Sequence, residues 1–479
     1  MIKVLIPFIR QVELIMNPQE IKTFRPENAF FLPSLKAEIC YPENIKYMKI
    51  FAKIIFLLIA IISLTISCDK HKNDDKPKND VLATEDSIYW FIDGLMDYWY
   101  LWNDSLPNLD YLDYDSPQDL IEDLIVTRDH WSFVDKEETV NSLFQEGEDF
   151  GYGFYLTWDS QSKLRVLFSY PGTAAYTAGI DRGCVIEKIN DSSVIEIDNF
   201  DFFFSYDPGS TKFDFTDHNG VPQSITLTKE KYYMKGVLFA DIYELNNKSV
   251  GYIVFQSFLE YAEEELVDAF ETFHSAGVSE IIIDLRYNSG GYVSIAEKLA
   301  NILIPESKVG SVFYTLKHND DRSPIQDTTV HFRNNSLNLN LNRVFFITNE
   351  YSASASELVI NCLKPHMDVK TIGNTTYGKP VAMYGFNFQD WLVLPVTAKT
   401  INSEGYGDYF EGITPQRKVV DESAFAWGDL NEPSLHQAFY FIENEVFDAS
   451  AIALKGTRNP RLVKGGGKRL QNNLLIMNR

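Results

Sequence analysis

The sequence has few of the residues that build disulfide frameworks or metal sites. Its 479 residues include only four cysteines, far apart in the chain and without a CxxC pair. The eight histidines are scattered, and no HExxH pattern occurs. Neither a disulfide framework nor a zinc site is therefore indicated.

The chain also has fewer basic than acidic residues. The chain has 43 lysines and arginines against 67 acidic residues, a formal net charge of −24. Such a chain repels phosphate backbones, which argues against a nucleic-acid partner. Hydrophobic residues make up 45% of the chain and aromatic residues 14%, which indicates a globular protein. Its length predicts two to four domains.

One segment suggests targeting. From Met48 the chain reads MKIFAKIIFLLIAIISLTISCDK, in which two lysines precede the apolar stretch Ile54–Leu64. This stretch is too short for a membrane span of about 20 residues but fits the core of a signal peptide. Residues 48–68 are therefore predicted to be a lipoprotein-type signal peptide, and 1–47 an upstream mis-start.

The end of this segment, LTISC, resembles the lipobox of bacterial lipoproteins, although its leucine lies one place further from the cysteine than usual. Cys68 is therefore predicted to be lipidated. A plain signal peptide or a short anchor helix is the alternative. A charged, proline-bearing linker at 69–83 follows, as expected for a tether. These features predict a lipid-anchored protein of a bacterial cell envelope, on the periplasmic side or the cell surface.

Residues 84–148 are predicted to form a small helical module. DSIYWFIDGLMDYWYLW has apolar residues at helical spacing, and SPQDLIEDLI opens with Ser-Pro like a helix start. Its many aromatic residues could form a binding face, although such residues more often pack in a core.

Residues 149–235 contain short β runs with glycines and resemble a PDZ domain. The stretch Pro171–Asn190 matches the helix-turn-strand signature of PDZ domains in bacterial proteases. The sequence GYGF matches the carboxylate-binding loop, where glycines let consecutive backbone N–H groups face one concavity. The strand that follows, from Tyr155, could accept an extended peptide by β-augmentation. By itself this Gly-x-Gly motif often marks only a bulge. The predicted carboxylate-binding residues are Gly151, Tyr152, Gly153 and Phe154.

From 236 to 445, predicted strands and helices alternate, which indicates a layered α/β domain. EIIIDLR and RVFFITNE read as buried strands, and AEEELVDAFETFHSAG as an amphipathic helix that Gly277 ends. Residues 446–479 include a basic, glycine-rich stretch and are predicted to be a mobile tail. Together these regions predict a multidomain α+β fold.

The strand ending near Asn349 is followed by three serines, Ser352, Ser354 and Ser356, and then by a predicted helix from about Ala355. A side chain on such a strand-to-helix turn lies among free N–H groups, which suits a nucleophile. Ser354 and Glu357 also have capping-box spacing, so Ser354 could be only an N-cap.

Lys379 lies between Gly378 and Pro380, with apolar neighbours on either side. A desolvated lysine loses its preference for the charged form, so its neutral amine can act as a base. A serine hydroxyl needs such a base to attack a carbonyl.

The motifs SASASE, GNTTYGKP and IIIDLRYNSGGY, in their order along residues 84 to 444, resemble those of the carboxyl-terminal processing peptidases, or tail-specific proteases. The resemblance implies that Ser354 is the nucleophile and Lys379 the general base. It also implies an oxyanion hole made by the backbone of Gly290 or Gly291, with Gly290 preferred, paired with the N–H of Ala355.

Two positions depart from the family pattern. Many members carry an aspartate where this chain has Pro365 and a glutamine where it has Met383. Both are thought to support the dyad, so the group that orients Lys379 is left open, with Asp368 as one candidate.

Other candidate residues have simpler explanations. His366 is expected to be an exposed loop residue, Asp284 and Arg286 a structural ion pair, and Glu411 a surface charge. Cys184 and Cys362 are expected to fill space in cores.

The predicted function is a lipid-anchored serine endopeptidase that cleaves proteins or peptides, which a PDZ domain would capture through a C-terminus or an extended segment. No metal or organic cofactor is required. The alternatives are a catalytically inactive peptide- or ligand-binding protein on the same fold, and an envelope adaptor whose aromatic module docks a partner. The sequence does not settle the oligomeric state.

Overall fold

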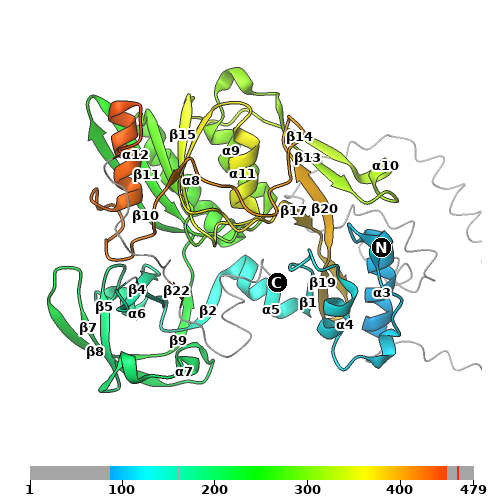
Figure 1. Ribbon diagram of the computed structural model, residues 1–479, viewed down its shortest axis with the longest axis horizontal. Coiled ribbons are helices and arrows are strands. Elements are labelled where there is room, and N and C mark those ends of the chain that lie inside the picture. Colours follow the sequence, from blue (N-terminus) through cyan, green and yellow to red (C-terminus); the bar gives the residue numbers. More distant parts are fainter. Residues whose placement is uncertain (1–86, 160, 450–460, 463–479) are drawn as a thin grey trace, which may run out of the picture. The chain divides into compact units, whose positions relative to one another are not determined.

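The computed structural model describes residues 87–159, 161–449 and 461–462 (Figure 1). The predicted mis-start, signal peptide, linker and lipidation site at Cys68 lie outside this part of the chain. The predicted basic tail lies outside it too, apart from residues 446–449 and 461–462. Among the described helices, none combines the length and the apolar character that crossing a bilayer requires.

The first part of the described chain is helical, as predicted, but it also contributes a strand. Helix α4 starts at the predicted Ser-Pro, and Ser116 Oγ accepts the amide of Asp119 at 3.2 Å. Beyond it, β1 pairs antiparallel with β19 (Trp391–Leu394), far along the chain. The aromatic residues pack in a core with residues 381–396, as expected of such side chains. The elements are α3 (Ser87–Trp99), α4 (Pro117–Leu124), β1 (Phe133–Lys136) and α5 (Glu137–Asn141).

Residues 149–235, which keep here the name PDZ-like region from the predicted resemblance, contribute β3 to β8 to a sheet with the strand order β22-β3-β4-β5-β7-β8. The short helix α6 is capped by Thr173, whose hydroxyl accepts the amide of Tyr176 at 3.3 Å. A separate ladder of β2 with β9 joins the two ends of the region. The elements are β2 (Glu148–Gly151), β3 (Phe154–Trp158), β4 (Leu164–Ser169), α6 (Ala174–Thr177), β5 (Val185–Ile189), α7 (Asp201–Phe204), β7 (Ser210–Thr216), β8 (Pro222–Thr228), β9 (Glu230–Tyr233) and β22 (Arg461–Leu462).

The layered domain is built on a six-stranded sheet, β10-β11-β12-β15-β16-β21. All neighbouring strands run parallel except β10, which is antiparallel to β11. Alternate residues point to opposite faces, so Ile281 and Ile283 pack against α8, α9 and α11, and Ile282 packs against α12 (Figure 1). This confirms the predicted α/β layers. The strands are β10 (Val237–Leu245), β11 (Lys248–Phe255), β12 (Glu280–Asp284), β15 (Arg343–Thr348), β16 (Asp368–Gly373) and β21 (Arg417–Lys418); the helices are α8 (Glu263–Ser275), α9 (Val293–Leu303), α11 (Ala355–Leu363) and α12 (Pro433–Asn444).

Two smaller sheets connect this domain to the N-terminal module. One has the order β14-β13-β20-β17, and the other β1-β19-β18. Lys379 comes shortly before β17, so these sheets fix the chain that carries it. The strands are β13 (Val312–His318), β14 (Thr328–His331), β17 (Val381–Met383), β18 (Phe386–Phe388), β19 (Trp391–Leu394) and β20 (Val396–Ile401).

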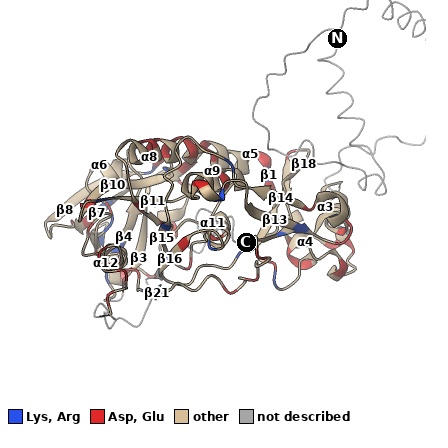
Figure 2. Cartoon of the chain, turned by 90° about the horizontal axis from the view of Figure 1, so that it is seen from above, with Lys and Arg blue, Asp and Glu red and all other residues tan. Residues whose placement is uncertain are grey.

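Acidic side chains lie on several of the helices. Figure 2 shows acidic residues, coloured red along the ribbon, on α8 and around α3 and α4. Three glutamates occupy the first turn of α8, where the partial positive charge of the helix N-terminus favours them. The helix ends before Gly277, whose φ of 68° lies in the left-handed region, as the sequence predicts for a stop residue.

Candidate active site

Ser354 occupies the turn between β15 and α11, at the carboxyl end of the parallel sheet. It is half-buried, whereas Ala353 and Ala355 on either side are buried. Its φ of 54° and ψ of −111° are unusual for a residue with a side chain. Strained backbone of this kind persists only where the surroundings hold it, and it is often found at functional sites.

The other two serines of the motif hold the turn together. Ser352 Oγ donates to the carbonyl of Leu285 at 2.8 Å, and Ser356 Oγ donates to the carbonyl of Asn288 at 3.0 Å. Both side chains are fully buried. Ser354 is therefore the one member of the trio whose side chain borders the surface, in agreement with its choice as the candidate nucleophile.

The carboxylate of Glu357 holds the serine turn and the lysine segment together. Its Oε2 accepts the amide of Ser354 at 3.0 Å and the amide of Lys379 at 2.8 Å. Its Oε1 accepts the amide of Gly378 at 2.7 Å and the hydroxyl of Thr376 at 2.5 Å. Because the amide nitrogens of Ser354 and Lys379 both lie within 3.0 Å of the same oxygen atom, the backbones of these two residues lie close together.

Glu357 also makes the capping contact that its spacing from Ser354 predicted, so the N-cap interpretation of Ser354 is correct as well. The two roles, N-cap and candidate nucleophile, do not exclude each other, because a hydroxyl that accepts the amide of Glu357 in the capping box still has its own proton to donate. Burial raises the pKa of Glu357 to about 7, although the hydrogen bonds from Thr376 and the three amides favour its charged form.

Lys379 has the environment that its sequence neighbours predicted. Its side chain is 3% exposed, and its Nζ donates to Met383 Sδ at 3.2 Å. Burial lowers the pKa of Lys379 to about 7, and the carboxylates of Asp129 and Glu357 act in the opposite direction. An amine of this pKa is largely neutral at slightly alkaline pH and can accept a proton.

The Gly290–Gly291 loop packs directly against the serine turn. A Cβ on Gly290 would lie 2.7 Å from Ser354 Cβ and 3.0 Å from the amide nitrogen of Ala355. The amide of Gly290 donates to Asn288 Oδ1 at 2.9 Å, so it would have to leave this acceptor to bind an oxyanion. The choice of Gly290, Gly291 and Ala355 as oxyanion donors stays a prediction.

Two parts of this chain match known protein families. Peptidase family S41 matches residues 249–419, and the peptidase S41 N-terminal domain matches residues 87–133. Residues 249–419 and 87–133 of this chain are therefore similar to peptidase S41 domains. These matches support the predicted resemblance to the carboxyl-terminal processing peptidases.

The relatives are distant. A CtpA-like serine protease of Staphylococcus aureus strain N315 is 31% identical over 59% of this chain and 55% of its own. Another, of Staphylococcus haemolyticus, is 27% identical over 60% of this chain and 56% of its own. The chain thus spans about half the length of these curated relatives. A solved S41 protease structure from Bacteroides fragilis NCTC 9343 has a TM-score of 0.61 at 23% identity, covering 79% of this chain and all of that one, and shows the shared fold.

Two sequence-based suggestions for this chain are wrong. Asp368 cannot replace the family aspartate, because it begins β16 and pairs in register with Arg343, whereas the serine turn follows the opposite end of the sheet. His366 is half-buried rather than exposed, and its Nε2 lies 2.9 Å from the carbonyl oxygen of Val312.

The expectations for Asp284 and Arg286, for the two cysteines and for Glu411 are confirmed. Asp284 and Arg286 form a buried ion pair at 2.6 Å, in a structural setting. Cys184 and Cys362 are both buried and free. Glu411 is exposed. Within the described part of the chain, no group of three histidine, cysteine, aspartate or glutamate residues could hold a metal ion.

The predicted carboxylate-binding loop lies between β2 and β3. Gly153 has a φ of 78°, and a Cβ there would lie 2.5 Å from the Thr173 side chain, so only glycine fits. The side chains of Tyr152 and Phe154 are buried in the core of the PDZ-like region. Gly153 has the conformation that glycine favours, and the role of the loop in binding a carboxylate stays a prediction.

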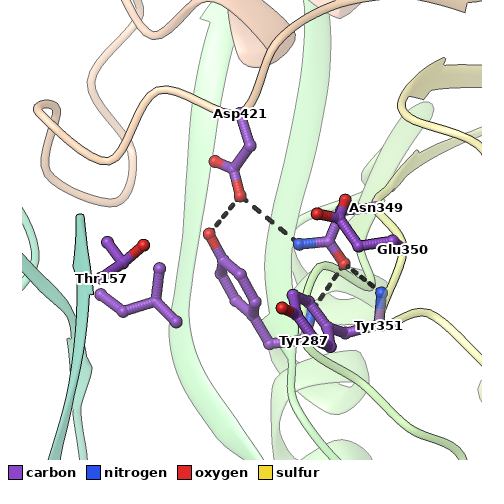
Figure 3. A pocket seen from close by; sticks show the side chains of 7 residues that line it. Thr157, Tyr287, Asn349, Glu350, Tyr351 and Asp421 are labelled. Atoms are coloured by element: carbon purple, nitrogen blue, oxygen red, sulfur yellow. Dashed lines mark hydrogen bonds between the residues drawn. The ribbon is translucent and has the colours of Figure 1, made fainter. Parts of the chain in front are cut away.

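Sequence reasoning missed a buried ionic cluster that connects the PDZ-like region to the loops of the site. Arg182 and Arg286 each donate to Asp421 Oδ1 at 2.9 Å, and Arg286 also donates to Glu432 at 2.9 Å. The Tyr287 hydroxyl also donates to Asp421 (Figure 3). These residues are far apart in the chain, so no local pattern could reveal the cluster. A small pocket beside it is lined by Thr157, Leu167, Tyr287, Asn349, Glu350, Tyr351 and Asp421.

Proposed function

We propose that this protein is a serine-type endopeptidase that uses Ser354 as nucleophile and Lys379 as general base. The observation that carries the proposal is that one carboxylate oxygen of Glu357 accepts both backbone amides, at 3.0 and 2.8 Å. This contact supports the proposal because it holds the backbone of a half-buried serine close to the backbone of a buried lysine of lowered pKa. A neutral amine beside a serine hydroxyl is the combination that acyl transfer requires.

In the proposed reaction, Ser354 Oγ attacks the scissile carbonyl carbon while Lys379 Nζ accepts the hydroxyl proton. The backbone amides of Ala355 and of Gly290 or Gly291 stabilise the negative charge on the carbonyl oxygen, an effect of about 3–4 kcal/mol per donor. The Lys379 ammonium then gives its proton to the leaving amine. A water molecule that Lys379 deprotonates attacks the acyl-enzyme and releases the product.

We infer that substrates reach the site through the PDZ-like region. Without β22, strand β3 would be an edge strand, with β4 on its other side. The described end of the chain pairs with this edge, because Arg461 and Leu462 lie opposite Trp158 and Thr157 in an antiparallel ladder. A strand edge that takes up an extended segment of its own chain supports binding of an extended or C-terminal substrate segment by β-augmentation.

The experiment that tests the activity compares Ser354→Ala and Lys379→Ala with the unaltered protein in the degradation of a fluorescein-labelled unfolded casein. Both variants are expected to lose at least 99% of the rate while circular dichroism shows a retained fold. Ser403→Ala, an exposed serine, serves as the control and is expected to keep full activity. Activity at the unaltered level in either dyad variant would overturn the proposal and favour the ligand-binding alternative.

We also propose, from the sequence alone, that the protein is anchored in a bacterial cell envelope through a lipid on Cys68. The supporting features are the apolar stretch before this cysteine and the charged linker after it. Mass spectrometry of the mature N-terminus is expected to find a diacylglyceryl-modified Cys68 as the first residue. An unmodified mature start at another position would contradict the anchor.

A further inference from the structure

The two side chains that support the lysine in many family members are replaced here by Pro365 and Met383. The structure removes Asp368 from consideration and places Met383 Sδ 3.2 Å from Lys379 Nζ. A thioether sulfur is only a weak hydrogen-bond acceptor and carries no charge. It cannot by itself stabilise the ammonium that forms when the amine accepts a proton.

The negative charges of two carboxylates, Asp129 in the loop between α4 and β1 and Glu357 on α11, raise the pKa of Lys379 against the larger effect of burial. Glu357 is engaged by the backbone amides of Ser354, Gly378 and Lys379 and by the hydroxyl of Thr376. Asp129 belongs to the N-terminal module, and of the two carboxylates its charge is the one that does not also hold the backbone of the serine turn.

The carboxylate of Asp129 is buried and rigidly oriented. Its side chain is only 2% exposed. Oδ1 accepts the amides of Trp131 and Ser132 at 2.8 and 3.0 Å, and Oδ2 accepts the hydroxyl of Ser132 at 2.5 Å. These hydrogen bonds fix the position of the carboxylate, so its negative charge stays at a constant distance from the neighbouring groups.

A chain of contacts connects this carboxylate to the lysine. Ser132 Oγ, which donates to Asp129, accepts the amide of Val396 at 2.9 Å. Val396 in β20 pairs with Met383 in β17, and Met383 Sδ contacts Lys379 Nζ. The loop that carries Asp129 thus packs against the strand pair that carries the partner of the amine. Trp131 belongs to the same apolar core as Tyr377 and Met383.

We propose that Asp129 is a positioning residue for the general base, supplied by the N-terminal module, which stabilises the ammonium form of Lys379 during proton transfer. The inference rests on the proposed Ser354–Lys379 mechanism. Its effect is opposite in sign to burial: burial lowers the pKa of Lys379, and the negative charge of Asp129 raises it. Asp129 lies within residues 87–133, which match the peptidase S41 N-terminal domain, so this module completes the site.

Asp129→Asn tests the proposal, because asparagine has the same shape and its carbonyl oxygen can still accept the two backbone amides. The pH profile of kcat/KM is measured for the unaltered protein and the variant. Removing the negative charge is expected to lower the midpoint of the acid limb by about 0.5–1 pH unit and to reduce the plateau rate about tenfold, with KM changed less than twofold. A residue that acted only on the fold would reduce the rate and leave the midpoint unchanged.

Asp135→Asn is the matched control. It removes a nearby carboxylate in β1 and changes the net charge of the protein by the same amount. Its midpoint is expected to equal that of the unaltered protein. If Asp129→Asn does not fold, Asp129→Ser removes the same charge with a smaller side chain and is expected to give the same shift. An unshifted midpoint in an active charge-removing variant overturns the proposal.

A second measurement separates this inference from the proposed activity. The titration of Lys379 is followed by NMR of the ¹³C-labelled lysine in the Ser354→Ala background, with and without Asp129→Asn. A lower midpoint in the double variant supports the role of Asp129 even if the protein proves not to be a peptidase. Equal midpoints overturn that role even if Ser354 proves essential for proteolysis.

Discussion

The backbone amides of Ser354 and Lys379 donate to the same oxygen atom, Oε2 of Glu357. This shared acceptor sets the separation of the two segments that carry the proposed nucleophile and base. A side chain that acts as a helix cap in the local sequence therefore also joins two parts of the site that are far apart along the chain.

Glu357→Gln is expected to reduce kcat at least 100-fold while keeping the chain folded. The amide NH₂ group of glutamine cannot accept hydrogen bonds, so it would face either the amides of Ser354 and Lys379 or the donors of Thr376 and Gly378. One pair of buried donors would lose its partner, which destabilises the protein by about 2–4 kcal/mol. Activity assays and urea unfolding check the two effects. A rate within threefold of the unaltered protein would contradict the role of Glu357 in holding the dyad.

Activity is expected to rise with pH through about 7. The pKa of Lys379 is lowered to about 7 by burial, and the amine must be neutral to accept the serine proton. The profile of kcat/KM should therefore show an acid limb with a midpoint near this value, checked between pH 5 and 9 on a peptide without titrating groups. A midpoint above 9 would indicate a lysine that remains protonated and would exclude it as the base.

The same lysine is expected to destabilise the fold. Its folded-state pKa lies below the ordinary 10.5, so the unfolded chain binds more protons and stability rises with pH between about 7 and 10.5. Lys379→Met removes this penalty, and the free energy of unfolding at pH 7 should increase by about 1–3 kcal/mol while activity disappears. Urea unfolding at pH 7 and pH 9.5 should show a smaller gain at the higher pH. An equal gain in the free energy of unfolding at both pH values would mean that better packing alone causes the gain.

Much of the site could be predicted from the sequence because its key residues stand next to secondary-structure boundaries. The buried strand before Asn349 and the capping spacing of Ser354 and Glu357 determine the turn. The apolar neighbours of Lys379 indicate its burial. Local patterns of this kind report on one segment and the element beside it.

The rest depends on contacts between distant segments. β1 pairs with β19, and the loop of Asp129 contacts β20 through Ser132 and Val396. Asp129 carries no local signal, because an aspartate that binds the amides of its own loop has the pattern of an ordinary turn. Asp368 shows the opposite error: its closeness to the serine in sequence suggested a role that the direction of β16 excludes.

The buried cluster around Asp421 predicts an unequal effect of its two arginines. Arg286→Met leaves Asp284 and Glu432 without their main cationic partner, whereas Arg182→Met leaves Asp421 paired with Arg286. Removing one partner of a buried ion pair typically destabilises a protein by about 3–5 kcal/mol. Arg286→Met should therefore destabilise the protein more than Arg182→Met, by at least about 1 kcal/mol in urea unfolding. The reverse order would show that Arg182 is the main partner of Asp421.

The same cluster predicts acid sensitivity. Burial opposes the effect, but Arg286 and Arg182 lower the pKa of Asp421 below its ordinary value. The stability that this carboxylate contributes is present above its unfolded-state pKa and is lost as the pH falls toward the folded value. Thermal unfolding between pH 6 and pH 3 should show a steeper loss in the unaltered protein than in Asp421→Asn. Parallel curves would assign the acid sensitivity to other groups.

The strand edge of β3 should bind peptides more tightly once the end of the chain is removed. Arg461 and Leu462 pair with this edge and are tethered to the protein, so a substrate segment competes with a partner at an effective concentration in the millimolar range. Deletion of residues 450–479 is expected to strengthen binding of an extended fluorescent peptide several-fold. The affinity is measured by fluorescence anisotropy in the Ser354→Ala background, so the peptide is not cleaved.

A full-length variant separates backbone pairing from the loss of the tail. Arg461→Pro with Leu462→Pro removes the two amides and should reproduce the gain in peptide affinity, because proline cannot donate to a strand ladder. Arg461→Ala with Leu462→Ala keeps the amides and is expected to bind like the full-length chain. Equal affinities in the deletion, the proline variant and the full-length chain would mean that peptides do not bind at β3.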